Sequence, residues 1–252
     1  MIKPIIAGNW KMNKTIAEAE VFASRLKAAF TATAPPDREV IIAPPFTALR
    51  ALSDALQGSF VRLAGQNLYE AEKGAFTGEV SAGMLKEAGC TYCLVGHSER
   101  RTLFAEDNAQ VNRKLVAALK CGLKPILCVG ESLQEREAGQ TFAVIERQLK
   151  EGLNNLSAGD IELCAVAYEP VWAIGTGKTA SPEQAQEVHC FIREQILAIY
   201  GASVASAIAI IYGGSVTPDN APALLALPDI NGALIGGASL DVEAFIRIIK
   251  GS

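Results

Sequence analysis

The stretch AYEPVWAIGTGKTA, residues 167–180, contains a complete strand end, a loop and the approach to a helix. Within it Glu169 directly precedes Pro170, and a residue before proline is restricted to extended conformations. The apolar run from Ile161 to Ala167 leads into this pair and has the length and composition of a buried strand. The sequence therefore predicts a carboxylate held at the end of a strand, with a loop departing at once.

The loop after this carboxylate combines a bulky segment with a glycine-rich one. Val171 to Ile174 forms a stiff, partly apolar tip, and Gly175 to Gly177 forms a flexible tail. A helix is expected after Ser181, with Pro182 at its first position and Gln184 completing a capping box. A mobile lid behind a fixed base suits a reaction that must exclude water.

Two nucleotide-binding motifs resemble this stretch without fitting it. GKT at Gly177 to Thr179 suggests a P-loop, but that motif needs a glycine where this chain has Trp172. Gly175, Gly177 and Ala180 match the looser dinucleotide fingerprint, whose glycines open a helix. Here the helix cap follows the last of them, so we assign the glycines to the loop. Taken alone, the stretch also fits a structural turn with a packed tryptophan.

Composition limits the classes of partner. The chain has 252 residues, of which 50% are hydrophobic, enough for a substantial core. A net charge of −4 gives no reason to expect nucleic acid or an anionic membrane, so any attraction of an anionic substrate must be local. No apolar run has the length of a membrane span, and the N-terminus lacks a signal-peptide pattern, which predicts a cytoplasmic protein.

The cysteines do not form a disulfide or metal pattern. They are Cys90, Cys93, Cys121, Cys128, Cys164 and Cys190. Six cysteines in so long a chain do not indicate a disulfide framework. Cys90 and Cys93 form a CxxC without a second pair, at the start of an expected strand, so we interpret them as packing residues rather than zinc ligands or a redox pair.

Eight short apolar runs recur along the chain. They are centred near Ile5, Ile41, Leu63, Leu94, Leu127, Val166, Ile210 and Leu234. Several are as continuously hydrophobic as parallel strands buried on both faces. Between them lie segments with helical spacing, such as Val111, Leu115 and Leu119, which step by four before Gly122. Eight alternations without a linker predict a closed (β/α)₈ barrel, a single α/β domain over residues 1–252, with an open doubly wound sheet as the alternative.

Other local patterns support the same alternation. Val188, Ile192 and Ile196 repeat the four-residue step of a buried helix face. Two further helix starts are expected. One has Ser132 followed three residues later by Glu135, and the other has Thr217 directly before Pro218.

Small or polar residues follow nearly every apolar run. They are Asn9 and Lys11, Gln66 and Asn67, His97 and Glu99, Glu131, Glu169, Ser215, and Gly236 with Gly237. Catalytic residues of such barrels come from the C-terminal ends of strands and the loops that follow them. The first, fourth and sixth ends would therefore bring a cation, an imidazole and a carboxylate to one mouth.

Some of these candidates also have ordinary structural explanations. Asn9 and Lys11 are two residues apart, so in an extended chain their side chains point the same way and could clamp an anionic substrate; the alternative is an ordinary surface lysine after a strand. Of the two histidines, His97 lies at a strand end, where barrels place chemistry, whereas His189 lies within a helix among apolar neighbours and is interpreted as structural. GHSER resembles a nucleophile elbow, but Arg100 replaces its last glycine, which argues against a serine nucleophile.

The last two strand ends have the composition of an anion site. Tyr212–Ser215 (YGGS) and Gly236–Ser239 (GGAS) each offer unobstructed backbone N–H groups and a hydroxyl. Phosphate sites in such barrels are often built from the loops after strands seven and eight. A glycine pair alone can simply make a turn. Two pairs in successive final loops, with Gly175 as a further donor, favour a phosphate site.

These residues give the sequence a close resemblance to the triosephosphate isomerase family along essentially the whole chain. The matching stretches are GNWKMN from Gly8, GAFTGE from Gly74, GHSERR from Gly96, AYEPVWAIGTGKTA from Ala167, YGGSV from Tyr212 and GGASL from Gly236. The resemblance implies interconversion of dihydroxyacetone phosphate and D-glyceraldehyde 3-phosphate through an enediolate, in glycolysis and gluconeogenesis. It implies no metal and no organic cofactor.

The resemblance also implies roles for individual residues. Glu169 is the base, and His97 polarises the carbonyl as a neutral electrophile and moves a proton between the two oxygens. Lys11 and Asn9 stabilise the developing charge and bind substrate, and Glu99 positions or relays within the site. The phosphate ligands implied are Gly175, Ser215, Gly236 and Gly237.

Two further expectations follow, the first from helix electrostatics and the second from the same resemblance. A helix starting after His97 would disfavour the imidazolium through its N-terminal dipole. The protein is expected to be a homodimer in which the loop Gly74 to Glu79 brings Thr77 near Asn9 and His97 of the partner subunit.

Two other functions fit parts of the pattern. A glycosidase would use two carboxylates such as Glu99 and Glu169, but it would want an aromatic-rich cleft, and aromatic residues are only 6% of this chain. A non-catalytic phosphate-binding barrel explains the glycine loops. It gives no reason for Glu169, His97 and Lys11 to share one mouth.

Overall fold

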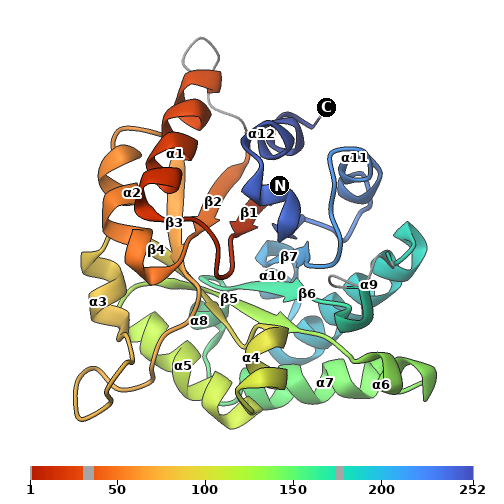
Figure 1. The fold of residues 1–252 in the computed structure, drawn as a ribbon. Helices are drawn as coiled ribbons and strands as arrows, with labels where there is room; N and C mark the ends of the chain where they lie inside the picture. The colour runs from red at the N-terminus through yellow and green to blue at the C-terminus, as the bar shows by residue number, and fades with distance from the viewer. Residues whose placement is uncertain (1, 31–36, 174–178, 252) are drawn as a thin grey trace.

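The computed structural model describes residues 2–30, 37–173 and 179–251. Its centre is a closed barrel of eight parallel strands, each hydrogen-bonded to the next in chain order, with β8 returning to β1 (Figure 1). The strands are β1 (Ile5–Asn9), β2 (Glu39–Ala43), β3 (Val61–Gly65), β4 (Cys90–Val95), β5 (Lys124–Val129), β6 (Ala165–Tyr168), β7 (Ala209–Tyr212) and β8 (Gly232–Ile235). All eight predicted apolar runs are centred within these strands, so the closed barrel is confirmed and the open sheet is excluded.

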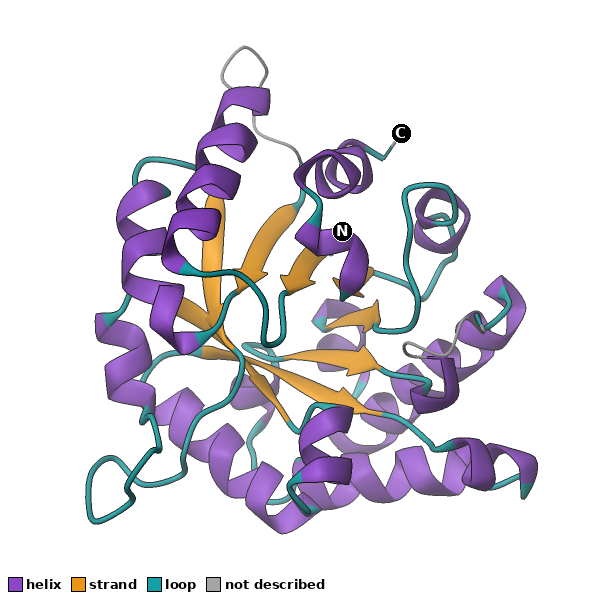
Figure 2. Cartoon of the chain, viewed as in Figure 1, coloured by secondary structure: helices purple, strands orange, loops and turns teal. Residues whose placement is uncertain are grey.

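Helices surround the barrel, as Figure 2 shows. The α-helices are α1 (Ile16–Phe30), α2 (Leu49–Ala55), α3 (Ala82–Glu87), α4 (Ser98–Leu103), α5 (Asn108–Lys120), α6 (Leu133–Glu137), α7 (Thr141–Gly152), α8 (Ala158–Ile161), α9 (Pro182–Tyr200), α10 (Ala202–Ala207), α11 (Ala221–Leu225) and α12 (Val242–Lys250). Short 3₁₀ turns are η1 (Phe46–Ala48), η2 (Val171–Ala173) and η3 (Gly237–Leu240).

Two apolar cores hold the layers together. Successive strand residues point to opposite faces, so on β1 Ile5 and Ala7 face the barrel interior and Ile6 faces the helices. The interior core is smaller than the core between strands and helices, which also takes up the helix residues Val188 and Ile192. Burying both faces of every strand explains why the runs in the sequence are continuously hydrophobic.

Two of the three helix starts predicted from capping patterns are found in the structure. Ser181 caps α9 with Gln184 completing its capping box, and Ser132 with Glu135 does the same for α6. Thr217 differs, because it caps a turn in which its hydroxyl accepts from the Asn220 N–H, and α11 begins only afterwards.

The predicted strand from residue 161 to 167 is wrong at its start. Ser157 and Asp160 form a capping box that begins the short helix α8, and Ile161 is the last residue of that helix. The strand β6 therefore begins only at Ala165. Apolar composition alone does not distinguish a buried helical turn from a buried strand.

The seam between β7 and β8 is the shortest in the barrel. Its only paired residues are Tyr212 and Ala233, whereas every other seam has at least three pairs. Asn231 reinforces it: its N–H donates to the Ile210 carbonyl at 2.7 Å, and its Oδ1 accepts the Ile210 N–H at 3.1 Å. Arg193 donates to the same Oδ1 at 2.7 Å.

Two of the cysteines lie within the barrel wall. Cys90 and Cys93 are buried in β4, as expected of packing residues, and burial raises the pKa of Cys90 to about 12. None of the helices in the described ranges combines the length and apolar character that crossing a bilayer requires.

Candidate active site

Glu169 and His97 meet at the carboxyl end of the barrel. Glu169 directly follows β6, and His97 lies two residues after the end of β4. Oε1 of Glu169 is 2.9 Å from Nε2 of His97. Both side chains are buried, with Glu169 1% and His97 6% exposed. The two strand ends thus bring a carboxylate and an imidazole into contact in a site largely shielded from water.

Backbone groups at the start of α4 orient both side chains. Oε2 of Glu169 accepts the Ser98 N–H at 2.8 Å. His97 is the N-cap of α4, and its Nδ1 accepts the Glu99 N–H at 3.2 Å. Because Nδ1 is an acceptor, a neutral His97 ring carries its proton on Nε2, the nitrogen that faces Glu169.

The pair shifts the pKa of both groups. Burial favours the neutral form of His97, but the adjacent Glu169 carboxylate, together with Glu99, outweighs it, so the pKa of His97 is raised. Burial likewise opposes ionisation of Glu169, but His97, the Ser98 N–H and Lys11 outweigh it, so its pKa is lowered. The expected effect of the helix start on His97 is therefore overridden while Glu169 touches the ring.

Lys11 is held against Glu99 in an unusual backbone conformation. Its Nζ lies 2.5 Å from Oε1 of Glu99. Its φ of 52° is in the left-handed region, which a lysine rarely adopts without support. Support comes from Asn9, whose Oδ1 accepts the Lys11 N–H at 3.0 Å, and from Gln66, whose side-chain amide donates to the Lys11 carbonyl at 2.8 Å. Asn9 and Gln66 thus fix the turn that delivers the ammonium group.

One cavity of about 340 Å³ unites most of the predicted site residues. Its lining includes Asn9, Lys11, His97, Glu169, Ser215, Gly236 and Gly237. Glu99 is absent from the lining and reaches the site through Lys11. Gly175 lies outside the described residues, as does most of the predicted lid. The structure thus gathers seven of the nine predicted residues around a single hollow.

The two glycines after β8 leave open space beside this cavity. Among the described residues, a Cβ on Gly237 would meet nothing within 4 Å, and a Cβ on Gly236 would lie 3.7 Å from Cε of Lys11. Packing against this part of the chain does not require glycine at either position. Their bare backbone is therefore accessible from the cavity, as an anion site needs. Ser239 turns its hydroxyl away to donate to the Gly236 carbonyl at 2.7 Å.

Two other glycines make room for Glu169, a role that the sequence pattern does not reveal. A Cβ on Gly130 would lie 1.7 Å from the Glu169 carbonyl oxygen, and a Cβ on Gly213 would lie 2.8 Å from Cγ of Glu169. Gly213 belongs to the predicted phosphate loop, yet its nearest constraint is the carboxylate side chain. Both glycines allow Glu169 to sit deep between its neighbouring strand ends.

Glu131 anchors the first turn of the loop that follows Glu169. It is fully buried, and its Oε1 accepts from Trp172 Nε1 at 2.9 Å, Arg136 at 3.0 Å and the Tyr168 hydroxyl at 3.1 Å. The sequence placed Glu131 at a strand end without a partner. The only signal that could have linked it to Trp172 is that both follow neighbouring strands, β5 and β6.

His189 and Ser98 occupy different places relative to the cavity. His189 is fully buried on α9, with Nδ1 2.7 Å from the Ala185 carbonyl, and it does not line the cavity. Ser98 contributes its backbone N–H to Glu169. Within the described ranges, no group of three histidine, cysteine, aspartate or glutamate side chains is placed to hold a metal ion.

Comparison with known proteins identifies a matching family. The family model described as triosephosphate isomerase matches residues 4–252. Triosephosphate isomerase from Syntrophotalea carbinolica is 54% identical over 250 residues, covering 99% of this chain and 98% of its own. The enzyme of that name from Carboxydothermus hydrogenoformans is 51% identical over 252 residues, covering all of both chains. The crystal structure of triosephosphate isomerase from Bartonella henselae matches with a TM-score of 0.88 and 40% identity, covering 99% of each chain.

Proposed function

Because the chain belongs to the triosephosphate isomerase family, and is thus an isomerase, we propose that it interconverts dihydroxyacetone phosphate and D-glyceraldehyde 3-phosphate through an enediolate. One observation carries the mechanism: Oε1 of Glu169 lies 2.9 Å from Nε2 of His97 in a cavity that Lys11 and the glycine loops also line. A base, a proton carrier, a cation and an anion site are the parts that this reaction requires.

Glu169 is the base in this proposal. It removes a proton from the carbon beside the carbonyl, and the electron pair left behind forms the carbon–carbon double bond of the enediolate. Its lowered pKa keeps it ionised at neutral pH.

His97 moves the second proton. A neutral ring donates from Nε2 to the carbonyl oxygen and then takes a proton from the neighbouring oxygen, so the ring ends unchanged. The Glu99 N–H at Nδ1 supports this tautomer. The ionised Glu169 raises the pKa of His97, and this effect ends once Glu169 accepts the substrate proton. Burial then favours the neutral ring.

Lys11 and Asn9 stabilise the charge that develops on the substrate oxygen. An ammonium group in a partly buried site acts more strongly than it would in water. We assign Glu99 the task of positioning this ammonium through their 2.5 Å contact. The left-handed turn at Lys11 supports the assignment, because strained backbone is kept where function needs it.

The phosphate group is proposed to lie against Gly236, Gly237 and Ser215, with Gly175 as a further ligand. Support comes from the open space beside both glycines and from their position at the start of η3. Lys11 is close to the same space, since its Cε is the nearest atom to a Cβ on Gly236. No cofactor enters any step.

A homodimer belongs to the same proposal. The loop after β3 extends away from the barrel at the lower left of Figure 1, and it includes the exposed residues Phe76 and Thr77. A loop that projects in this way is suited to reach a second subunit. The reaction would serve glycolysis and gluconeogenesis in the cytoplasm.

The proposal is tested by measuring turnover of both triose phosphates with purified protein, together with exchange of the substrate's carbon-bound hydrogen with solvent. Turnover with solvent exchange is expected, because the abstracted proton resides on a carboxylate. Absence of turnover would refute the activity. Turnover without any solvent exchange in either product would argue against Glu169 as a base. Sedimentation analysis tests the dimer separately.

A further inference from the structure

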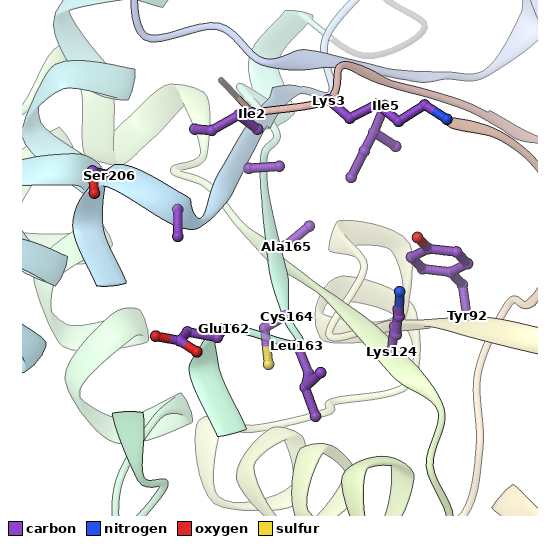
Figure 3. A pocket seen from close by; sticks show the side chains of 12 residues that line it. Ile2, Lys3, Ile5, Tyr92, Lys124, Glu162, Leu163, Cys164, Ala165 and Ser206 are labelled. Carbon is purple, nitrogen blue, oxygen red and sulfur yellow. The ribbon is translucent and has the colours of Figure 1, made fainter. Parts of the chain in front are cut away.

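The amino end of the barrel is hollow on one side. On β6 and β7 the inward-facing residues nearest this end are Ala165 and Ala209, which pair with each other. The same interior core has the much larger Ile5 and Tyr92 on β1 and β4. Because small side chains oppose large ones, a cavity of about 480 Å³ remains at this end (Figure 3). It is larger than the cavity at the candidate active site.

This hollow is separate from the active site. It is lined by residues that begin strands, Ile5, Lys124, Ala165 and Ala209, whereas the active-site residues follow strand ends. The amino face of such barrels ordinarily serves stability, which a filled interior would provide best. An unfilled interior there calls for another explanation.

Charge is distributed unequally around the hollow. Lys3 and Lys124 lie on the side of Tyr92, and Glu162 lies on the opposite side (Figure 3). The lining therefore has two ammonium groups against one carboxylate, in a protein whose net charge is −4. Just outside the lining, Glu39 lies 3.7 Å from Lys3 and also 3.7 Å from Arg62. The two lysines and Arg62 together still outnumber Glu39 and Glu162, and this local excess of positive charge favours an anion.

Lys124 is the best placed of these groups. It pairs in register with Tyr92, so both point toward the barrel interior. Its Nζ lies 5.7 Å from the centre of the Tyr92 ring. In the described part of the chain, no carboxylate forms an ion pair with Lys124. It is an available cation at the edge of an apolar floor.

We propose that the hollow is a second ligand site that binds a small organic monoanion, with its apolar body over Ala165 and Ala209 and its anionic group against Lys124. The apolar body of the ligand would cover Ala165 and Ala209 and exclude water from them. The ammonium group of Lys124 would fix the orientation of the ligand. A free inorganic anion would gain only the ammonium contact. The site therefore selects for an anion that also has an apolar part.

Naphthalene-1-sulfonate is a suitable probe, because it joins a flat apolar body to one sulfonate. We expect saturable binding by isothermal titration calorimetry that persists with inorganic phosphate at a concentration that fills the active site. Lys124→Gln should weaken binding about fivefold, as the loss of one exposed ion pair does. Ala207→Leu, at the exposed rim of the hollow, should abolish binding by filling the space.

A matched control and the activity assay complete the test. Lys150→Gln removes an exposed lysine on α7 and should leave probe affinity unchanged. Turnover of triose phosphate should be normal in all three variants, so this proposal can fail without affecting the proposed function. Absence of saturable binding, displacement by phosphate, or equal affinity in the wild-type, Lys124→Gln and Ala207→Leu proteins would each overturn it.

Discussion

Gly213 and Glu169 are packed so closely that a Cβ on Gly213 would lie 2.8 Å from Cγ of Glu169. The two residues follow adjacent strands, and the Gly213 N–H donates to the carbonyl of Tyr168, the neighbour of Glu169. The depth at which the carboxylate sits therefore depends on a missing side chain one strand away.

Gly213→Ala is expected to lower kcat about 100-fold, because displacing a catalytic group by about 1 Å has an effect of that size. Steady-state kinetics with both triose phosphates measure it. Gly159→Ala is the control, since the nearest atom to its added Cβ is 3.9 Å away. Equal kcat in wild type and Gly213→Ala would show that the carboxylate tolerates the shift.

Glu169→Gln is expected to lower kcat by about 10³-fold, because it removes the proton acceptor and keeps the side-chain shape. Affinity for inorganic phosphate, measured by calorimetry, should stay near the wild-type value. Glu187→Gln, an exposed carboxylate on α9, serves as the control. A higher KM at normal kcat would mean that Glu169 only binds substrate.

Gly237→Ala should weaken binding of phosphate and raise KM, because its Cβ has no neighbour within 4 Å among residues 2–30, 37–173 and 179–251 and would occupy the space proposed for the phosphate. Folding stability should be unchanged for the same reason. Calorimetric titration with inorganic phosphate gives the affinity. If that affinity matched the wild type, the phosphate would have to lie elsewhere in the cavity.

The buried His189 is expected to lower the free energy of unfolding in mild acid. Burial lowers its pKa to about 4, from 6.5 when exposed, despite the nearby Ala185 carbonyl. Between pH 6.5 and pH 4, His189 therefore binds a proton in the unfolded chain but not in the folded chain. The contribution of neutral His189 to the free energy of unfolding is complete above pH 6.5. It declines by about 3 kcal/mol as the pH falls toward 4.

The comparison variant is His189→Gln, which lacks this titration. Denaturant unfolding at pH 7.5 and pH 4.5, at one protein concentration, should show a smaller acid loss for the variant than for wild type. Identical losses would mean that His189 is protonated within the fold.

Glu131→Ala should destabilise the protein by about 3 kcal/mol, the lower end for breaking a buried ion pair, since the side chain of Arg136 is partly exposed. The substitution removes one acceptor from three donors. Tyr168→Phe removes one of those bonds and should lose about 1 kcal/mol. Chemical denaturation compares them, and a loss for Glu131→Ala no larger than for Tyr168→Phe would contradict the role of Glu131.

The sequence predicted the barrel well because parallel strands buried on both faces have a distinctive composition. It also predicted the mouth of the barrel, since polar residues such as Asn9, His97 and Glu169 interrupt that composition at strand ends. The start of β6 was missed because a capping box at Ser157 turns apolar residues into a helix.

Contacts between side chains from different strands were beyond the sequence. Nothing in local composition indicates that Trp172 donates to Glu131, or that Gly130 and Gly213 make room for Glu169. The pKa of His97 is another case. The helix start at Ser98 was predicted, but the overriding carboxylate comes from a different strand. Predicting such contacts and pKa shifts requires knowing the distance between two strand ends, which the sequence does not contain.

The brief pairing of β7 with β8 gives the barrel a built-in point of weakness. At this seam the backbone N–H and the side-chain Oδ1 of Asn231 bond to Ile210, and Arg193 holds the same Oδ1, in place of a longer run of paired strand residues. Both proposed phosphate loops spring from these two strands. Local opening of the barrel is expected to begin at the seam between β7 and β8. The proposed anion pocket would then lose its shape before Glu169 and His97 separate.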